Sequence, residues 1–180
     1  MPVSSSCGVC GKRTIQEVLA LGPTGGQGNG GPFVSAEGRL KEGVLVRMPG
    51  RLRRKQRLFH ATGGLHAAGI FDSQGSMLRV EEDVGRHNAV DKVIGWALLE
   101  GLTPLSRRFL QVSGRISFEI VQKAYRAGFP LVAAVSGVSS LAVSFASEAG
   151  MTLVGFLRGS SFSIYTHAGR IMKRGAASDK

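Results

Sequence analysis

Residues 112–117 have the sequence Val-Ser-Gly-Arg-Ile-Ser, and residues 135–140 repeat it in altered form as Val-Ser-Gly-Val-Ser-Ser. Each copy lies between a predicted strand and a predicted helix, and each of those helices ends in an Ala-Gly pair, at Gly128 or Gly150. The glycine within each copy permits a tight turn, the serine at its end can cap a helix, and the final glycine favours a helix C-terminus. The repeat therefore predicts two successive β-α units.

The same alternation extends to both sides of the repeat. Apolar segments bounded by turn residues predict strands near Leu65–Phe71, Met77–Glu81, Phe109–Val112, Leu131–Val135, Leu153–Phe156 and Phe162–Tyr165. Apolar residues at helical spacing, with helix start and stop signals, predict helices over about Arg51–Ala61, Arg86–Leu99, Ser117–Ala127 and Ser140–Ala149. Strands that alternate with helices predict an α/β domain with a largely parallel sheet that is covered on both faces.

The composition limits the class of protein. The chain has 180 residues, of which 43% are hydrophobic and 19% are charged, as expected for a soluble protein folded around one core. No apolar run reaches the roughly 18 residues that a membrane-spanning helix needs. Residues 1–6 lack the basic start and the apolar stretch of a signal peptide, so we expect a cytoplasmic protein with no membrane association.

Basic residues give the chain a formal net charge of +11. They are densest in one short run, which contains Arg51, Arg53, Arg54, Lys55 and Arg57. This run indicates either a solvated helix face or a surface for an anionic ligand or an acidic partner protein. Nucleic-acid binding is disfavoured, because the aromatic side chains that stack on bases are scarce and Phe59 stands almost alone beside the run.

The two Ser-Gly turns are candidates for ligand binding. In a parallel sheet they lie at the carboxyl ends of neighbouring strands, where open α/β sheets bind ligands. Free backbone N–H groups and the positive end of a helix favour phosphate there. Two adjacent turns with an arginine in one of them suit a diphosphate, although ordinary capped β-α turns remain the alternative. The residues concerned are Ser113, Gly114, Arg115, Ser136 and Ser139.

Residues 81–92 form the densest run of polar functional groups in the chain. They lie at a predicted strand-to-helix junction, where Asp83 is placed to cap the helix. A capped and salt-bridged helix start accounts for the two glutamates of the run. Helix capping alone does not account for Arg86, His87 and Asn88. Their side chains can supply hydrogen bonds to a base or a phosphate.

A third segment, residues 62–68, has the sequence Thr-Gly-Gly-Leu-His-Ala-Ala. Its two glycines let a ligand or a neighbouring strand approach the backbone closely, and His66 is either a ligand-binding residue or a satisfied core histidine. A zinc nucleobase deaminase needs His-x-Glu and a later Pro-Cys-x-x-Cys. Ala68 stands where that glutamate would be, and no cysteine follows Cys10, so deaminase chemistry is disfavoured.

The only cysteines are Cys7 and Cys10, in the sequence Ser-Cys-Gly-Val-Cys-Gly-Lys-Arg. A disulfide between residues this close would constrain the unfolded chain very little, which favours a chemical role. Lys12 and Arg13 favour the thiolate, the form that attacks a persulfide or a disulfide. One Cys-x-x-Cys supplies half of the four ligands of a tetrahedral zinc site, so zinc binding would need two chains that pool their pairs.

Residues 22–31 are rich in glycine and cannot bury enough apolar area to offset their backbone entropy, so they predict a flexible linker. We therefore divide the chain into a mobile Cys-x-x-Cys arm with its linker, residues 1–31, and an α/β cofactor-binding domain, residues 32–180. A thioredoxin-like site would place the cysteine pair at a strand-to-helix turn. A mobile arm instead suits a sulfur carrier that moves between partners.

Taken together, these motifs resemble the formate dehydrogenase accessory sulfurtransferase family, FdhD. The resemblance covers nearly the whole chain in order and rests on residues 6–11, 62–68, 82–92, 113–119 and 153–159. It implies a cytidine deaminase-like, three-layer α/β/α fold with a mostly parallel central sheet and no zinc.

The resemblance also implies a function. Members of this family take sulfur as a cysteine persulfide from a cysteine desulfurase. They deliver it to the molybdenum of the bis(molybdopterin guanine dinucleotide) cofactor before that cofactor enters formate dehydrogenase. The family is dimeric and binds guanine nucleotides, so GDP is expected to act as a surrogate ligand.

On this chain, the resemblance makes Cys7 the persulfide carrier and Cys10 its neighbour. Arg158 is suited to bind a phosphate through bidentate hydrogen bonds. The cofactor-binding segment implied by the resemblance consists of Phe156, Leu157, Arg158, Gly159, Ser160 and Ser161.

The chain departs from the family pattern at two places. The family normally has a β-rich segment ahead of the cysteine motif, and we expect this chain to lack it. Residues 136–140 are Ser-Gly-Val-Ser-Ser, where the family tends to have Ser-Ala-Pro-Thr-Ser. Two other functions stay open: a chaperone that binds the molybdenum cofactor without transferring sulfur, and a structural zinc protein.

Overall fold

Three parallel strands form the centre of the fold. They are β4 (Phe109–Val112), β5 (Leu131–Ala134) and β6 (Thr152–Arg158). Every residue of β4 and β5 is buried, which is typical of parallel strands covered on both faces. The computed structural model in which these strands are seen describes residues 15–23 and 38–173.

The flanking strands run antiparallel to their neighbours. β2 (His66–Phe71) pairs with β4 and with β3 (Met77–Asp83), and β7 (Ser161–Thr166) pairs with β6, giving the order β3-β2-β4-β5-β6-β7. The predicted parallel arrangement is therefore confirmed for the three central strands, and the sheet as a whole is mixed. The reason is that β2–β3 and β6–β7 are joined by short hairpin connections, which can link only antiparallel strands.

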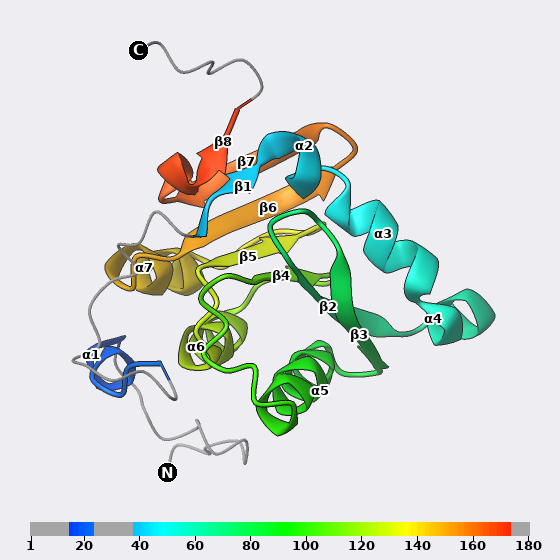
Figure 1. Cartoon of the computed structure of the whole chain (residues 1–180), viewed down its shortest axis with the longest axis horizontal. Coiled ribbons are helices and arrows are strands. Elements are labelled where there is room, and N and C mark those ends of the chain that lie inside the picture. Colours follow the sequence, from blue (N-terminus) through cyan, green and yellow to red (C-terminus); the bar gives the residue numbers. More distant parts are fainter. Residues whose placement is uncertain (1–14, 24–37, 174–180) are drawn as a thin grey trace.

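Helices cover both faces of this sheet (Figure 1). α5 (Arg86–Leu99), α6 (Phe118–Ala127) and α7 (Ser140–Glu148) lie on one face, and α2 (Glu42–Leu45) and α3 (Met48–Lys55) lie on the other. Alternate residues of the central strands point to opposite sides, as the two-residue period of a strand requires. The three layers agree with the prediction, whereas the likeness to cytidine deaminase stays a prediction.

Smaller elements complete the described chain. β1 (Leu40–Lys41) and β8 (Ile171–Met172) pair in parallel as a separate two-stranded sheet on the α2 side. α4 (Arg57–Thr62) follows α3, and a 3₁₀ turn, η2 (Ala168–Arg170), precedes β8. None of the helices within the described ranges is long and apolar enough to cross a membrane.

A helix that precedes the glycine-rich segment packs against the domain. Val18 in α1 (Ile15–Leu19) is fully buried, and the Tyr125 hydroxyl donates to the Leu19 carbonyl over 3.3 Å. Arg126 donates to the Leu21 carbonyl over 2.6 Å. This part of the predicted mobile arm is therefore attached to α6. Residues 1–14 and 24–31 of that arm lie outside the described residues, so the rest of that division stays a prediction.

Three local predictions are wrong. Ser117, the serine at the end of the first repeat, is the N-cap residue of α6, but its side chain makes no capping hydrogen bond. The single helix predicted over residues 51–61 is two helices, because the backbone leaves helical geometry at Gln56, where ψ is 77°. Asp83 does not cap α5, whose N-cap is Gly85. Asp83 is instead the last residue of β3, and its Oδ1 accepts hydrogen bonds from the Gly85 N–H over 2.9 Å and the Asn88 amide over 3.0 Å.

Candidate functional site

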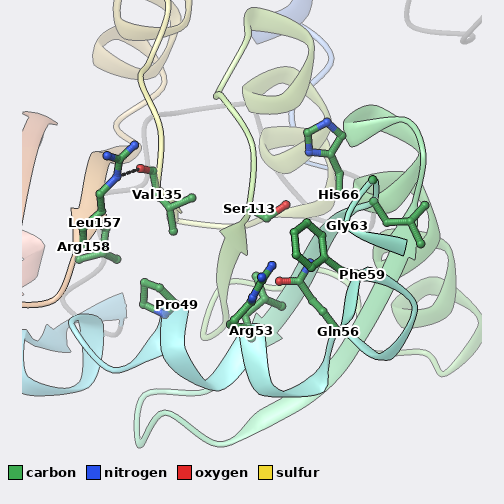
Figure 2. Close-up of a pocket in the computed structure, with 13 residues that line it drawn as sticks. Pro49, Arg53, Gln56, Phe59, Gly63, His66, Ser113, Val135, Leu157 and Arg158 are labelled. Atoms are coloured by element: carbon green, nitrogen blue, oxygen red, sulfur yellow. Dashed lines mark hydrogen bonds between the residues drawn. The ribbon is translucent and has the colours of Figure 1, made fainter. Parts of the chain in front are cut away.

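A pocket of about 600 Å³ lies at the carboxyl ends of the central strands, between them and the helices α3 and α4 (Figure 2). This volume is typical of small-molecule sites. One side, here called the strand-end wall, consists of Ser113, Val135, Leu157 and Arg158. The opposite side, the helix wall, consists of Pro49, Leu52, Arg53, Gln56 and Phe59. Residues 63–66 complete the lining.

The two Ser-Gly turns lie side by side at this edge of the sheet, as predicted. The Ile116 N–H donates to the Gly137 carbonyl over 3.0 Å, and the Ser139 N–H donates to the Ile116 carbonyl over the same distance. These bonds extend the β4–β5 pairing past the ends of both strands. The strand-end wall is thus fixed by backbone hydrogen bonds.

Ser113 joins the first turn to the neighbouring strand. Its Oγ accepts a hydrogen bond from the Ala67 N–H over 2.8 Å, and its own N–H donates to the Ala67 carbonyl over 2.9 Å. A hydroxyl also carries one hydrogen that it can donate. Ser113 is therefore held in place while its O–H can still donate to a ligand in the pocket.

Gly114 brings two predicted segments together. A Cβ atom at this buried glycine would lie 3.3 Å from His66 Nδ1 and 3.5 Å from Arg86 Cβ, so a side chain there would crowd both. His66 lies at the start of β2 and lines the pocket. Of the two positions that the sequence left open for it, His66 therefore occupies the pocket and not the core. The Arg86 Nε is buried and has no hydrogen-bond partner within the described residues.

A polar cluster at the start of α5 holds the helix entrances in place. His87 Nε2 lies 3.0 Å from Ser117 Oγ and 3.8 Å from Glu119 Oε2. Burial lowers the pKa of His87, and the positive charge of Arg86 lowers it further. The hydrogen bond from Ser117 lowers the pKa of Glu119. Neutral His87 and ionised Glu119 are thus both favoured at neutral pH.

Asp83 is an ion-pair partner beside the same helix start. Lys92 Nζ lies 2.7 Å from Asp83 Oδ2. The hydrogen bond that Lys92 donates to Asp83, with those from Gly85 and Asn88, lowers the pKa of Asp83 to about 2. The side-chain amide of Asn88 is therefore engaged by Asp83, and Asn88 is not among the residues that line the pocket.

The segment after β5 meets the β6–β7 hairpin at Phe156. The Phe156 N–H donates to the Ser136 carbonyl over 3.0 Å. The Phe156 ring packs on Gly137, where an added Cβ would lie 3.2 Å from the ring. Phe156 is 46% exposed and has φ +51°, a strained conformation for an aromatic residue. Backbone strain of this kind clusters at active sites and ligand clamps.

Arg158 is the cation of the strand-end wall. Its Nε donates to the Val135 carbonyl over 2.9 Å, which fixes the guanidinium beside the end of β5 (Figure 2). Leu157 is fully buried and lines the pocket beneath it. Gly159 and Ser160 connect β6 to β7, and Gly159 has φ +57°.

Of the predicted site residues, Ser113, Leu157 and Arg158 line the pocket. Ser139 caps α7 by accepting a hydrogen bond from the Ala142 N–H over 3.3 Å. Cys7 and Cys10 lie outside the described residues. The other predicted residues belong to the same edge of the sheet or to the β6–β7 hairpin but are outside this lining: Arg86, His87, Asn88, Gly114, Arg115, Ser136, Phe156, Gly159, Ser160 and Ser161.

The helix wall was not predicted as part of a site. Leu52, Gln56 and Phe59 are spaced by four and three residues, which would place them on one side of a continuous helix, and this spacing is the signal that could have revealed the wall. The Arg53 guanidinium lies 3.6 Å from the centroid of the Phe59 ring. Part of the basic run thus faces the pocket.

The rest of that run divides between structure and solvent. Arg51 donates to the Gly75 carbonyl in the β2–β3 turn. The side chains of Arg54, Lys55 and Arg57 are exposed and make no hydrogen bond or ion pair with another described residue. The histidine, aspartate and glutamate side chains of residues 15–23 and 38–173 form no group of three or more that could hold a metal ion.

Known proteins match this chain over most of its length. Residues 2–172 match the FdhD/NarQ family. The chain is 54% identical over 168 residues to the sulfur carrier protein FdhD of Mycobacterium tuberculosis, covering 93% of this chain and 58% of that protein. It is 46% identical over 169 residues to the sulfur carrier protein FdhD of Saccharolobus solfataricus, covering 94% of this chain and 61% of that protein.

A solved structure resembles the fold. It is the crystal structure of a candidate formate dehydrogenase accessory protein from Desulfotalea psychrophila, with a TM-score of 0.70 and 29% sequence identity, covering 76% of this chain and 58% of that one. The chain spans about three fifths of the length of the curated relatives it matches. Because the family match extends over residues 2–172, this chain belongs to the FdhD/NarQ family.

Proposed function

We propose that this chain is a sulfur carrier that serves formate dehydrogenase. In this proposal Cys7 accepts sulfur from a cysteine desulfurase and passes it to the molybdenum of a bis(molybdopterin guanine dinucleotide) cofactor. Family membership supports the carrier role. The observation that carries the cofactor part is the pocket at the carboxyl ends of β4, β5 and β6, which is where α/β sheets bind nucleotides.

The residues around this pocket fit such a substrate chemically. The partly exposed side chains of Pro49, Phe59 and Leu65 offer apolar surface for flat rings, and Arg158 offers a charged fork for a phosphate. The helix α6 begins directly after the first Ser-Gly turn, and the positive end of its dipole faces the same edge. The unpartnered Nε of Arg86 lies next to that turn and can donate to a further anionic group.

The loading of Cys7 with sulfur needs only the chemistry of a thiolate. Cys7 as a thiolate attacks the outer sulfur of the persulfide on the desulfurase. A new sulfur–sulfur bond forms on Cys7, the old one breaks, and the desulfurase cysteine leaves as a thiolate. Lys12 and Arg13 favour the attacking form of this pair. Cys10 would be the neighbouring thiol that tunes or resolves the persulfide.

The proposal has further parts, for which family membership is the support. GDP would occupy the pocket in place of a guanine end of the cofactor, and the protein would act as a homodimer in the cytoplasm. Its fold would share the three-layer arrangement of cytidine deaminase without zinc. Mixed strands flanking a parallel centre, with helices on both faces, are consistent with this likeness.

The test of the carrier role is intact mass. The full chain is incubated with a cysteine desulfurase and cysteine, without a reductant that cleaves persulfides. We expect it to gain the mass of one sulfur atom, Cys7→Ala to gain none, and Cys10→Ala to keep the gain. The proposal is wrong if the wild-type chain stays unmodified or if Cys7→Ala is modified to the same extent.

The pocket by itself also supports a second function. A chaperone that binds the molybdenum cofactor without relaying sulfur would need the same lining and no thiol. A variant that lacks both cysteines would then still activate formate dehydrogenase in cells. Loss of activation in this variant, with GDP binding intact, decides for the sulfur carrier.

A further inference from the structure

Four exposed leucines gather where α5 ends. Leu98 and Leu99 are the last two residues of α5 and are 56% and 89% exposed, and Leu102, just beyond the helix, is 39% exposed. Leu21, which follows α1, is 45% exposed. The Arg126 side chain joins the two segments, because it donates to the Leu21 carbonyl and lines a cavity of about 190 Å³ together with Leu98. The four leucines are here called the leucine patch.

The leucine patch is large for a surface that no partner covers. Its side chains together expose roughly 400 Å² of apolar surface. Contiguous patches of this size are among the largest that monomeric proteins expose, and they are often functional. Each partner in a stable complex buries about 800 Å². The patch therefore has the size of a transient docking surface and is small for a permanent dimer interface.

The cavity in the leucine patch indicates the chemistry of its partner. Ile94 and Leu98 give it an apolar lining, which suits an apolar side chain. Lys123 also lines it, but its charge is balanced by Asp91, to which Nζ donates over 2.6 Å. The charge of Arg126 has only carbonyl partners, those of Leu21 and Gly22. With a net charge of +11 on the whole chain, the surface attracts a partner that carries acidic side chains around an apolar one.

The leucine patch lies beside the point from which the two cysteines are tethered. α1 is fixed on α6 by its buried Val18 and by the hydrogen bonds that Arg126 donates (Figure 1). Eight residue steps separate Cys7 from Ile15, so Cys7 stays within about 29 Å of the start of α1, whatever path the chain takes between them. A protein seated on the patch is therefore within reach of Cys7.

The leucine patch and the pocket lie at opposite ends of α6. The helix begins directly after the first Ser-Gly turn, at the edge of the sheet where the pocket opens. Arg126 is its last residue but one, about 12 Å further along the axis. A partner can therefore dock on the patch while the pocket stays open for its own ligand.

We propose that the leucine patch is the docking surface for the protein that supplies sulfur to Cys7. This partner carries a cysteine persulfide and presents an apolar side chain flanked by acidic ones. The inference rests on the proposed function, since it requires Cys7 to accept sulfur. In the docked complex the Cys7 thiolate attacks the outer sulfur of the donor persulfide, a sulfur–sulfur bond forms on Cys7, and the donor cysteine leaves as a thiolate. A small persulfide in solution needs no docking surface to undergo the same exchange.

The test compares two sulfur sources on the full chain, with early loading followed by intact mass. One source is a cysteine desulfurase supplied with cysteine, and the other is glutathione persulfide. Leu99→Asp places a negative charge in the patch at a position so exposed that the fold should be almost unaffected. The chain concentration that gives half-maximal loading by the desulfurase should rise by roughly tenfold or more, as for a lost apolar contact at an interface. Loading by glutathione persulfide should match that of the wild-type chain.

Leu141→Asp is the matched control. Leu141 is 51% exposed, but it lies at the start of α7, directly after the second Ser-Gly turn and away from the C-terminal end of α6. This variant should load like the wild-type chain from both sources. Light scattering of the three proteins measures their oligomeric state.

Each outcome decides the inference. Weaker loading of Leu99→Asp by the desulfurase alone supports it. Equal loading of Leu99→Asp and the wild-type chain overturns it, and so does weaker loading from both sources, because the patch then does not act through docking. A wild-type dimer that Leu99→Asp dissociates assigns the patch to a second copy of the chain and also overturns it. A wild-type chain that gains no sulfur from the desulfurase removes the proposed function as well, whereas the other contrary outcomes remove this inference alone.

Discussion

The two walls of the pocket are held in place by different kinds of interaction. Beside the strand-end wall, backbone hydrogen bonds join Ile116, Gly137 and Ser139 in the two turns that directly follow buried strands. The helix wall depends on side chains from distant parts of the sequence. Glu82 holds the first N–H groups of α4, and α4 itself contains no buried residue.

This difference indicates which wall is rigid and which can adjust. The strand-end wall should be insensitive to the loss of single polar side chains and sensitive to any change in backbone spacing, because close packing leaves little room. The helix wall lacks a core of its own at α4, so its stability should follow the one carboxylate that caps it. A ligand that binds between the walls would then order mainly the helix wall.

The largest effect is expected from crowding the second Ser-Gly turn, which supports the strand-end wall. A Cβ atom at Gly155 would lie 2.9 Å from the Tyr165 ring, 3.0 Å from Val138 and 3.3 Å from the Ser136 carbonyl. Gly155→Ala should therefore lower the free energy of unfolding by about 1–3 kcal/mol. For a chain of this size, each kcal/mol corresponds to a fall of about 2–4 °C in the midpoint of thermal unfolding.

Gly169→Ala is the control for this substitution. No atom lies within 4 Å of a Cβ built there, and its melting temperature should stay close to that of the wild-type chain. Circular dichroism melting of the three proteins measures the difference. Equal melting temperatures for Gly155→Ala and Gly169→Ala would show that the strand-end wall yields to an added methyl group, contrary to the comparison between the walls.

An intermediate effect is expected from removing the cap of the helix wall. Glu82→Gln replaces a carboxylate that accepts two backbone hydrogen bonds at a helix N-terminus with a neutral amide. Losing an N-cap contact costs about 0.5–2 kcal/mol. We expect amide hydrogen exchange at Leu58 and Phe59 to accelerate by about threefold to thirtyfold, since 1.4 kcal/mol corresponds to a factor of ten. Amides in β4 and β5 should exchange as before.

Glu81→Gln provides the matched control at the neighbouring position. Glu81 pairs with Arg79, whose side chain is 44% exposed, and such surface ion pairs contribute about 1 kcal/mol or less. Its removal should leave exchange in α4 unchanged. If Glu82→Gln and Glu81→Gln had the same exchange pattern, Glu82 would not be the contact that holds the helix wall.

The same contrast explains how much of the molecule could be predicted from its sequence. The bounds of α5 and β4 were predicted correctly, and the two Ser-Gly turns were correctly placed side by side. Each of these features depends on residues close together in the chain: apolar periodicity, a glycine at a turn, or a glycine after a helix. The strand-end wall was therefore accessible to sequence reasoning.

The break between α3 and α4 that shapes the helix wall was not accessible, because its cause is remote. Nothing in residues 51–61 signals a break, since the segment contains no glycine or proline, and the cap that starts α4 comes from Glu82. The orientation of the flanking strands was missed for a related reason. Strand-helix alternation predicts parallel pairing, and the pairings of β3 and β7 are decided by the short hairpin connections next to them.

The smallest effect is a pH dependence from the helix entrances beside the strand-end wall. Burial, aided by Arg86, lowers the pKa of His87 below its ordinary 6.5, while Glu119 and Asp91 act in the opposite sense and Lys123 in the same sense. At a pH between the lowered pKa of His87 in the folded chain and its ordinary pKa in the unfolded chain, the unfolded chain binds more protons than the folded one. The free energy of unfolding therefore rises with pH through this window and falls as the pH drops below 6.5.

His87→Gln should flatten this part of the profile, measured as the free energy of unfolding in guanidinium chloride between pH 5 and 8. The effect should be smaller than those of Gly155→Ala and Glu82→Gln, because a third of the His87 side chain is exposed and water moderates the cost of its charge. The pKa of Asp83, about 2, keeps its own titration below this range. A His87 resonance that titrates at or above 6.5 in NMR spectra would contradict the assignment. In that case the charge of Glu119 would outweigh burial, and the helix entrances would be stabilised by acid, opposite to the sign derived above.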